Sequence, residues 1–439
     1  MYLARSIVSS ATAALLLGLS PDSALADTIT IATVDNGDMV RMQGLAERFT
    51  EANPDIELEW AVFDENTLRQ RVTTDIATGG GRFDVVTIGT YEASIWAERG
   101  WLAPLDDLPD DYDIDDLLPT IRAGLSHEGM LYGAPFYGES SFTMYRTDLF
   151  EEAGLEMPDE PTWDFIREAA ATLTDRENDV SGICLRGKPG WGENMALVTA
   201  MANSYGARWF DEEWQPEFGG DAWNSVLADY AGMLKDHGPT DAALKGFQEN
   251  LALFREGKCA IWVDATSAGQ FVTDESSSVA DSVGFAMAPD NGLGKRANWL
   301  WAWALAVPES TDADASAKRF VAWATSKDYI DLVAEADGWA SVPPGTRASL
   351  YENPEYQKVS FAEMTLASIN AADPTEPAVE EVPYTGIQFV AIPEFQSIGT
   401  AVGQRFAKAL DGSISSDEAL DDAQWVTERV IERTDLLGQ

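Results

Sequence analysis

Strand-like and helix-like segments alternate from the beginning of this chain, and this alternation limits the available folds more than any other feature. Residues 28–34, 56–63 and 83–88 are rich in β-favouring side chains. Between the first two, apolar residues recur at helical spacing over residues 42–49, and another helical pattern precedes the glycines at 79–81. An order of strand, helix, strand, helix, strand predicts a parallel sheet covered by helices, with ligands at the carboxyl ends of the strands.

A second cycle follows further along the chain. Strand-like runs at 181–185, 259–263 and 283–287 alternate with helical patterns, which predicts a second α/β lobe. A strongly apolar, strand-like run then covers residues 299–308. No long low-complexity linker separates the halves, so we expect lobes joined by several chain crossings.

The first 26 residues are typical of an export signal. Arg5 precedes an apolar run over residues 11–19, and Ala24, Leu25 and Ala26 provide the small residues that a signal peptidase requires. The run is too short to span a bilayer. We therefore expect cleavage after Ala26 and a mature protein that acts outside the cytoplasm.

Charge and export restrict the function. The chain carries 74 acidic against 29 basic residues, a formal net charge of −45. This excess makes nucleic acid and anionic membranes poor partners and indicates a solvated acidic surface. Outside the cytoplasm there is no ATP supply, which leaves a hydrolase, a binding protein or a structural component. The length favours two domains.

The cysteines and histidines are few. Cys184 and Cys259 each lie in a short strand-like run, so they form either a disulfide or two separate buried thiols. With only His127 and His237, the chain has little material for a histidine-rich metal site. We expect no metal and no cofactor.

Several separated motifs resemble the family 1 extracellular solute-binding proteins of ABC importers, the group that contains maltose-binding protein. Besides the export signal and the early strand-helix repeat, the motifs that carry this general resemblance are residues 133–139 (GAPFYGE), 257–262 (GKCAIW) and 303–308 (WALAVP). Three further motifs are most similar to the sorbitol- and mannitol-binding members: residues 190–194 (GWGEN), 264–267 (DATS) and 392–396 (IPEFQ).

The resemblance implies an α/β, two-lobed periplasmic binding protein fold of type II, in which each lobe has a mainly parallel sheet flanked by helices and a hinge joins the lobes. It implies an N-terminal lobe over residues 27–136 and 297–341 and a C-terminal lobe over residues 137–296 and 342–439. The lobes would close on a sugar alcohol and deliver it to the transmembrane subunits of a permease. We expect a periplasmic monomer.

The candidate ligand-binding residues of the first lobe follow predicted strands. Asn36 and Asp38 come directly after the first strand, where turn formation is an equal explanation. Tyr91 follows the third strand in the same way. Glu139 lies at the lobe crossing, at the family position of an acid that faces the cleft.

The second lobe and the late apolar run supply the other candidates. Arg186 could hold two hydroxyl groups with its planar guanidinium, and an ordinary ion pair is the alternative. The family also places an aromatic floor in the cleft, which Trp301 or Trp303 would provide. The further candidates are Trp191, Glu193, Asp264, Phe395 and Gln396.

Two alternatives remain open at this point. A monosaccharide or another small solute could replace the polyol. Glu139 and Asp264 could also act as acid and base in a periplasmic glycoside hydrolase, although no nucleophile motif is present. We expect a binding protein and no enzymatic activity.

Overall fold

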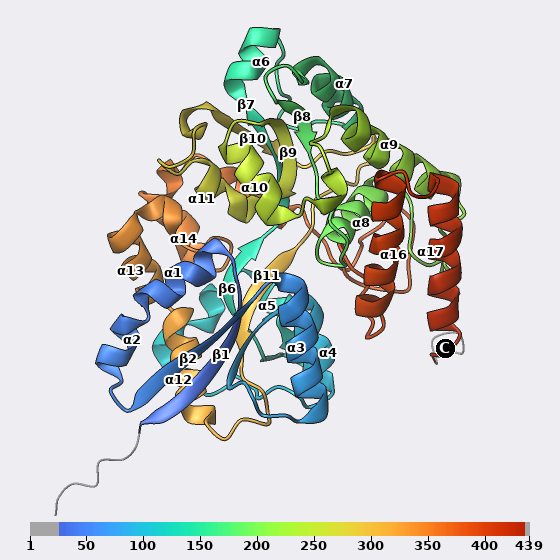
Figure 1. Ribbon diagram of the computed structural model, residues 1–439. Coiled ribbons are helices and arrows are strands. Elements are labelled where there is room, and N and C mark those ends of the chain that lie inside the picture. Colours follow the sequence, from blue (N-terminus) through green and yellow to red (C-terminus); the bar gives the residue numbers. More distant parts are fainter. Residues whose placement is uncertain (1–25, 435–439) are drawn as a thin grey trace, which may run out of the picture.

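The computed structural model describes residues 26–434, which fold into two lobes built on separate sheets (Figure 1). The expected signal peptide lies outside the described residues, apart from Ala26. The first sheet has the order β2 (Ile56–Phe63), β1 (Asp27–Val34), β3 (Val85–Gly89), β11 (Trp301–Ala306) and β6 (Ala134–Glu139). The second has the order β10 (Val283–Met287), β7 (Ser141–Arg146), β9 (Cys259–Ala265) and β8 (Ser181–Cys184). The two-lobed α/β prediction is confirmed.

In each sheet, one strand runs against all the others. β1 pairs in parallel with β2 and β3, whereas β11 is antiparallel to both β3 and β6. In the second sheet β8 and β9 are parallel, and β7 is antiparallel to β9 and β10. β7 is the first strand of the second sheet after the chain leaves the first lobe. β11 is the first strand that the chain adds to the first sheet after it returns from the second lobe.

Helices cover both sheets, and Figure 1 shows the red α16 and α17 beside α8 and α9 on the second lobe. The first lobe contains α1 (Gly37–Leu45), α2 (Glu47–Ala52), α3 (Glu65–Thr78), α4 (Thr90–Glu98), α5 (Pro119–Gly124), the short hairpin of β4 (Ser126–His127) and β5 (Met130–Leu131), α12 (Asp314–Ala324) and α13 (Lys327–Asp337). The rest of the chain contains α6 (Thr147–Ala153), α7 (Trp163–Leu173), α8 (Asn194–Ser204), α9 (Asp221–His237), α10 (Phe247–Arg255), α11 (Gly269–Val272), α14 (Ala348–Glu352), α15 (Ala362–Asn370), α16 (Phe395–Leu410) and α17 (Ser416–Ile431). Single 3-10 turns are η1 (Asp110–Tyr112), η2 (Ile114–Asp116), η3 (Ala242–Leu244), η4 (Thr266–Ala268), η5 (Ala280–Ser282), η6 (Trp339–Ser341) and η7 (Tyr356–Lys358).

Local sequence explains where α3 begins and ends, and α3 matters because it faces the other lobe. The Asp64 side chain accepts a hydrogen bond from the backbone N–H of Thr67, which caps the first turn. Gly79 adopts a left-handed conformation, with φ of 60°, and ends the helix. The triple glycine at 79–81 is therefore a helix terminus and the start of the loop to β3.

The chain passes between the lobes after β6, between β10 and β11, and after α13 (Figure 1). β6 continues to Glu139, past the boundary expected at residue 136, so the exact limits of the lobes stay a prediction. At the crossing, the backbones of Gly138 and Gly345 touch, and a Cβ on Gly345 would lie 2.1 Å from the Gly138 carbonyl oxygen. Gly345 also has a φ of 70°, so two independent constraints favour glycine there.

Candidate functional site

One cavity of about 210 Å³ lies between the lobes and takes its lining from both of them. β1 and its following loop, α3, β6 and β11 line it from the first lobe. The segment after β8, α10 and η4 line it from the second. The lining residues are Val34, Asp35, Asn36, Asp64, Glu65, Arg69, Tyr137, Glu139, Arg186, Lys188, Trp191, Gly192, Glu193, Ala196, Phe247, Gln248, Glu249, Ala265, Ser267, Trp299, Trp301, Trp303 and Gln388.

One wall of the cavity is centred on Arg186, which follows β8. Its Nε and Nη2 donate to the Asp264 carboxylate at 2.6–3.0 Å. Asp264 is fully buried and also accepts from Trp262 Nε1 at 3.0 Å and from the Ala265 backbone at 2.7 Å. Burial opposes the charge of the guanidinium, but the Asp264 carboxylate holds the pKa of Arg186 above its usual value. Asp264 therefore fixes Arg186 and is itself outside the cavity lining.

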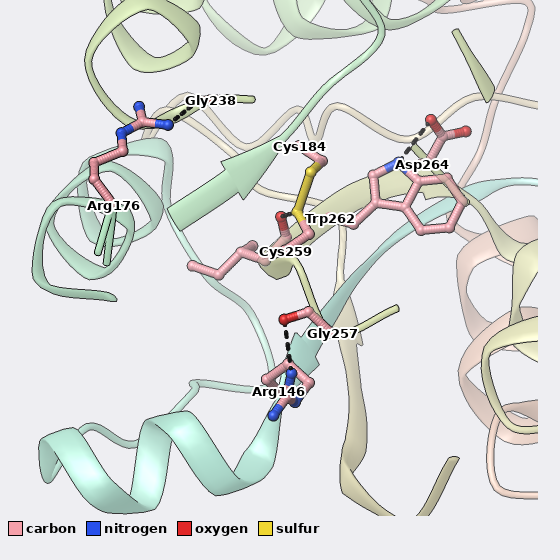
Figure 2. Close-up of a disulfide and its surroundings, with 9 residues drawn as sticks. Arg146, Arg176, Cys184, Gly238, Gly257, Cys259, Trp262 and Asp264 are labelled. Atoms are coloured by element: carbon pink, nitrogen blue, oxygen red, sulfur yellow. Dashed lines mark hydrogen bonds between the residues drawn. A yellow bond between two sulfur atoms is a disulfide. The ribbon is translucent and has the colours of Figure 1, made fainter. Parts of the chain in front are cut away.

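A disulfide ties together the two strands that carry this wall. Cys184 ends β8 and Cys259 begins β9, and Figure 2 shows the bond beside Trp262 and Asp264. The bridge closes a loop with a sequence separation of 75, and the Cα atoms lie 6.1 Å apart. Because Arg186 is two residues beyond Cys184, the bridge restrains the backbone on both sides of the Arg186–Asp264 pair.

The opposite wall is centred on Arg69 of α3, whose guanidinium lies among three indole rings. Its Cζ is 4.0 Å from the ring centre of Trp191 and 4.9 Å from those of Trp301 and Trp303. Its nitrogens are also paired with Glu92 at 2.6 Å and Glu65 at 3.0 Å. Burial opposes this charge, but Glu92 and Glu65 raise the pKa of Arg69. Trp191 belongs to the second lobe, so this wall is assembled across the cleft.

A close backbone approach completes that junction. A Cβ on Gly192 would lie 2.1 Å from Oε1 of Glu65, so a larger residue there would displace the Glu65 carboxylate that pairs with Arg69. Arg186 Nη1 donates to the Gly192 carbonyl oxygen at 2.9 Å, so the loop that carries Trp191 is held by the first wall and packs on the second.

Two acidic side chains face the cavity with shifted pKa values. Burial raises the pKa of Glu139 to about 8, against the opposing effects of the Ser267 hydroxyl and Arg186. Burial also raises the pKa of Glu193, which pairs with Lys188 at 3.2 Å. Both groups therefore bind protons more strongly in the closed cavity than in water.

Two buried polar atoms of the lining have no partner among the described residues. They are Trp191 Nε1, a donor, and Asn36 Oδ1, an acceptor. The Asn36 amide nitrogen donates to the Tyr137 hydroxyl at 2.8 Å. A buried polar atom without a partner is costly, so these atoms are available to a hydroxylated solute.

The structure brings seven of the twelve candidate residues to the cavity. They are Asn36, Glu139, Arg186, Trp191, Glu193, Trp301 and Trp303. Their roles in ligand binding stay a prediction, because the cavity geometry alone assigns no contact to a solute.

The other five candidates lie outside the lining for identifiable reasons. Asp264 is taken up by Arg186. Asp38 accepts from Gln270 at 2.8 Å and pairs with Arg41 at 2.9 Å, at the contact of α1 with α11.

The remaining three, Tyr91, Phe395 and Gln396, lie together behind Trp191. The Tyr91 hydroxyl donates to the Ile392 carbonyl at 3.0 Å and accepts from the Gln396 backbone at 3.2 Å. The Phe395 ring is fully buried, 6.2 Å from Trp191. These residues support the Trp191 side of the cavity and hold the lobes together.

Sequence reasoning missed several members of the lining, because their signals were weak. Glu65 and Arg69 lie on α3, for which the sequence offered no candidate residue, and Ser267 appeared only within the 264–267 motif. Trp299 opens the apolar run at 299–308, which was the one available signal. Asp35, which directly precedes Asn36, also lines the cavity. The missed residues are Val34, Asp64, Glu65, Arg69, Tyr137, Lys188, Gly192, Ala196, Phe247, Gln248, Glu249, Ala265, Ser267, Trp299 and Gln388.

Comparison with known proteins identifies solute-binding proteins as relatives of this chain. A family profile described as "Bacterial extracellular solute-binding protein" matches residues 36–330. The chain is 56% identical over 409 residues to a mannitol-binding protein of Pseudomonas aeruginosa, covering 93% of this chain and 94% of that protein. A putative binding protein of Brucella abortus is 24% identical over 298 residues, covering 67% of this chain and 70% of that protein.

Solved structures support the fold. A solute-binding protein of an ABC transporter from Agrobacterium vitis S4, with bound D-mannitol, has a TM-score of 0.92 and 60% identity, covering 93% of this chain and 99% of that chain. A solute-binding protein from Agrobacterium radiobacter K84, in complex with ribitol, has a TM-score of 0.81 and 23% identity, covering 92% and 99%. The latter likeness bears on the fold alone. Among the described residues, no helix is long and apolar enough to cross a membrane.

Proposed function

This chain belongs to the bacterial extracellular solute-binding protein family, and from this premise we propose that it captures a mannitol-like sugar alcohol between its lobes and delivers it to a membrane permease. The proposal draws on the relatives that bind mannitol and on the chemistry of the cavity. The cavity combines indole rings with hydrogen-bonding side chains, which suits the CH and OH groups of a polyol.

The observation that carries the proposal is that every cation of the cavity lining already has a carboxylate partner. Arg69 pairs with Glu92 and Glu65, Arg186 with Asp264, and Lys188 with Glu193. No positive charge is therefore left to bind an anionic solute, whereas the paired guanidinium and carboxylate groups still offer hydrogen bonds to hydroxyls. A neutral, hydroxyl-rich solute fits this balance best.

The size of the cavity favours a small solute. Its volume of about 210 Å³ is below the roughly 300–1,000 Å³ typical of pockets for drug-sized ligands. The indole of Trp191, which lines the cavity, is backed by the Phe395 ring of α16 at 6.2 Å. A cavity of this volume favours a single polyol or monosaccharide over an oligosaccharide.

The carboxylate pair that the sequence offered for glycoside hydrolysis does not meet in the cavity. The carboxylate pair considered from the sequence was Glu139 with Asp264, but Asp264 is fully buried and bonded to Arg186. A hydrolase of this kind needs two carboxyl groups that both reach the glycosidic bond. This supports solute capture without chemical conversion.

Calorimetry with D-mannitol, sorbitol, ribitol and maltose tests the proposal. We expect saturable one-to-one binding of at least one hexitol and no binding of maltose. At a hundredfold excess over the dissociation constant, the ligand stabilises the folded protein by about 3 kcal/mol, measured as a thermal shift. Binding of maltose but of no polyol would contradict the proposal.

We also infer periplasmic export with cleavage after Ala26. β1 begins at Asp27, whose backbone N–H donates to the Asp55 carbonyl oxygen at 2.8 Å, so the sheet starts at the residue that processing would expose. N-terminal sequencing of secreted protein checks the site, and a start other than Asp27 would refute it. Loss of polyol uptake after deletion of the neighbouring permease genes would identify the partner.

A further inference from the structure

Resting on the proposed function, we propose that Glu139 meets the solute as a neutral carboxylic acid that donates a hydrogen bond to a solute oxygen, and that closure of the lobes on the solute takes up a proton.

The two oxygens of Glu139 differ in their surroundings. Oε2 accepts a hydrogen bond from the Ser267 hydroxyl at 2.5 Å. Oε1 has no hydrogen-bond partner among residues 26–434, although the side chain lines the cavity and is only 6% exposed. The oxygen without a partner is therefore the one that can carry a proton to the solute.

No cation within the described part of the chain forms an ion pair with Glu139. Arg186 of the neighbouring wall makes three hydrogen bonds to Asp264, so its charge is already matched. Burial is the largest influence on Glu139 and disfavours its negative charge. Two carboxylates, Glu65 from α3 and Asp264 from β9, disfavour that charge as well, and their effect is smaller because each is paired with an arginine.

The remaining groups packed around it do not reverse this balance. Tyr137 on the same strand is buried, and its phenol pKa is raised by burial and by Glu139, so it stays neutral. The Ser267 hydroxyl and Arg186 lower the pKa of Glu139, but burial outweighs them and leaves it at about 8. In an open cleft, water would hydrate this carboxyl group and return its pKa towards the usual 4.5.

The difference in the pKa of Glu139 between the open and closed forms determines how solute affinity changes with pH. The closed form holds the proton more tightly than the open form, so the contribution of Glu139 to closure is fully present below the open-form pKa. It is lost as the pH rises through the closed-form value of about 8. Solute affinity should fall with rising pH across this window, by up to about tenfold per pH unit for one proton.

The contribution of Glu139 to the pH dependence of solute affinity can be distinguished from the contributions of other titrating groups. Burial raises the pKa of Asp38 to about 6, so its effect ends below the upper part of the window. His127 and His237 lie on β4 and α9, away from the cavity lining. Glu193 is the one other lining acid whose pKa is raised, and a variant must account for it.

The experiment is calorimetric titration with D-mannitol in two buffers of different ionisation enthalpy, at several pH values between about 6 and 8. For the unchanged protein we expect proton uptake on mannitol binding near pH 6 and the fall in affinity described above. Glu139→Gln, which keeps the size and a donor group, should bind mannitol with about one proton less taken up and a correspondingly shallower pH profile. Glu193→Gln measures the contribution of the other lining acid and should leave the Glu139-dependent uptake in place. Asp115→Asn, which changes an exposed carboxylate outside the cavity lining, is the matched control and should keep the pH profile of the unchanged protein.

If Glu139→Gln does not bind mannitol, Ser267→Ala provides a second test. Ser267→Ala removes a group that favours the ionised form, so the fall in affinity should move to higher pH. Mannitol binding with no proton uptake by the unchanged protein, or an unshifted profile in Ser267→Ala, would overturn the proposal and leave the proposed function intact. If no polyol binds at any pH, the proposed function fails and this inference fails with it.

Discussion

The two buried arginines of the cavity lie in walls that are built differently. Arg186 is fixed by Asp264 inside the second lobe, and the Cys184–Cys259 bridge ties the strands on either side. Arg69 is paired inside the first lobe, but its guanidinium also lies 4.0 Å from the Trp191 ring of the second lobe. The first wall can exist in the open protein, whereas the second is complete only when the lobes meet.

This difference separates folding from closure. A contact within one lobe contributes to the stability of the ligand-free protein, since it is present whether the cleft is open or closed. A contact between lobes contributes to the closed state alone, so its loss weakens solute affinity and leaves the open protein intact. Variants of the Arg186 wall should therefore change the stability of the ligand-free protein, whereas variants of the Arg69 wall should change solute affinity.

The largest effect is expected from Asp264→Ala, which leaves the Arg186 guanidinium buried without its partner. Breaking a buried ion pair destabilises by about 3–5 kcal/mol, so the ligand-free protein should unfold at a clearly lower temperature and mannitol binding should be lost. Thermal denaturation and calorimetry measure both. Asp55→Ala, which removes an exposed partner of Arg319, is the control and should leave the melting temperature nearly unchanged, because solvent screens that pair. An unchanged melting temperature in Asp264→Ala would break the comparison.

Removal of the disulfide is a second large change within one lobe. With a sequence separation of 75, Cys184→Ser with Cys259→Ser should lower the free energy of unfolding by about 4 kcal/mol on the chain-entropy estimate. Mannitol affinity, measured at a temperature where the variant is folded, should stay within about threefold, because the Arg186–Asp264 pair persists. A large loss of affinity at unchanged stability would show that the bridge acts on the closed state instead.

Trp191→Ala tests the wall that is assembled across the cleft. The change removes the ring that faces Arg69 from the second lobe. A desolvated cation–π contact contributes about 2 kcal/mol, so affinity, measured at a temperature where the variant is folded, should fall about thirtyfold or more. The ligand-free melting temperature should also fall, because Trp191 packs on Phe395 within the second lobe as well. Trp191→Phe keeps an aromatic ring and should lose less. Equal affinity in Trp191→Ala and the unchanged protein would be inconsistent with an interlobe role.

Tyr91→Phe should have the smallest effect of these variants, because it weakens one contact between the lobes. It removes the hydroxyl that donates to the Ile392 carbonyl across the lobes at 3.0 Å. One hydrogen bond contributes about 1 kcal/mol, so affinity should fall about fivefold while ligand-free stability is retained. Tyr112→Phe is matched to it, because the Tyr112 hydroxyl accepts from Thr325 within the first lobe. The control should lower stability and spare affinity, and the reverse pattern in either variant would count against the account.

The sequence predicted the parts of this molecule that depend on local pattern. Alternation placed Trp301 and Trp303 on one face of a strand, and both line the cavity. The end of the first strand marked the position of Asn36, and the strand at 56–63 agrees with β2 in both limits. Strand boundaries and strand faces follow from side chains that are neighbours in the chain.

The parts that sequence could not predict depend on contacts between distant residues. Asp264 lies near the end of its strand, as expected, but it turns to Arg186, which is 78 positions earlier, and this pairing removes it from the cavity. Arg69 gave no signal, because its importance comes from three tryptophans brought together by the fold. Asp38 was placed beside the first strand correctly, yet its partner Gln270 comes from the other lobe.

Small-angle X-ray scattering with and without D-mannitol measures closure itself. The account predicts that saturating mannitol reduces the radius of gyration, that the solute is recovered unchanged, and that Trp191→Ala needs more mannitol to reach the same compaction. A radius of gyration that does not respond to a bound polyol, or a solute recovered as a chemical product, would contradict the claim that the lobes close on an intact polyol.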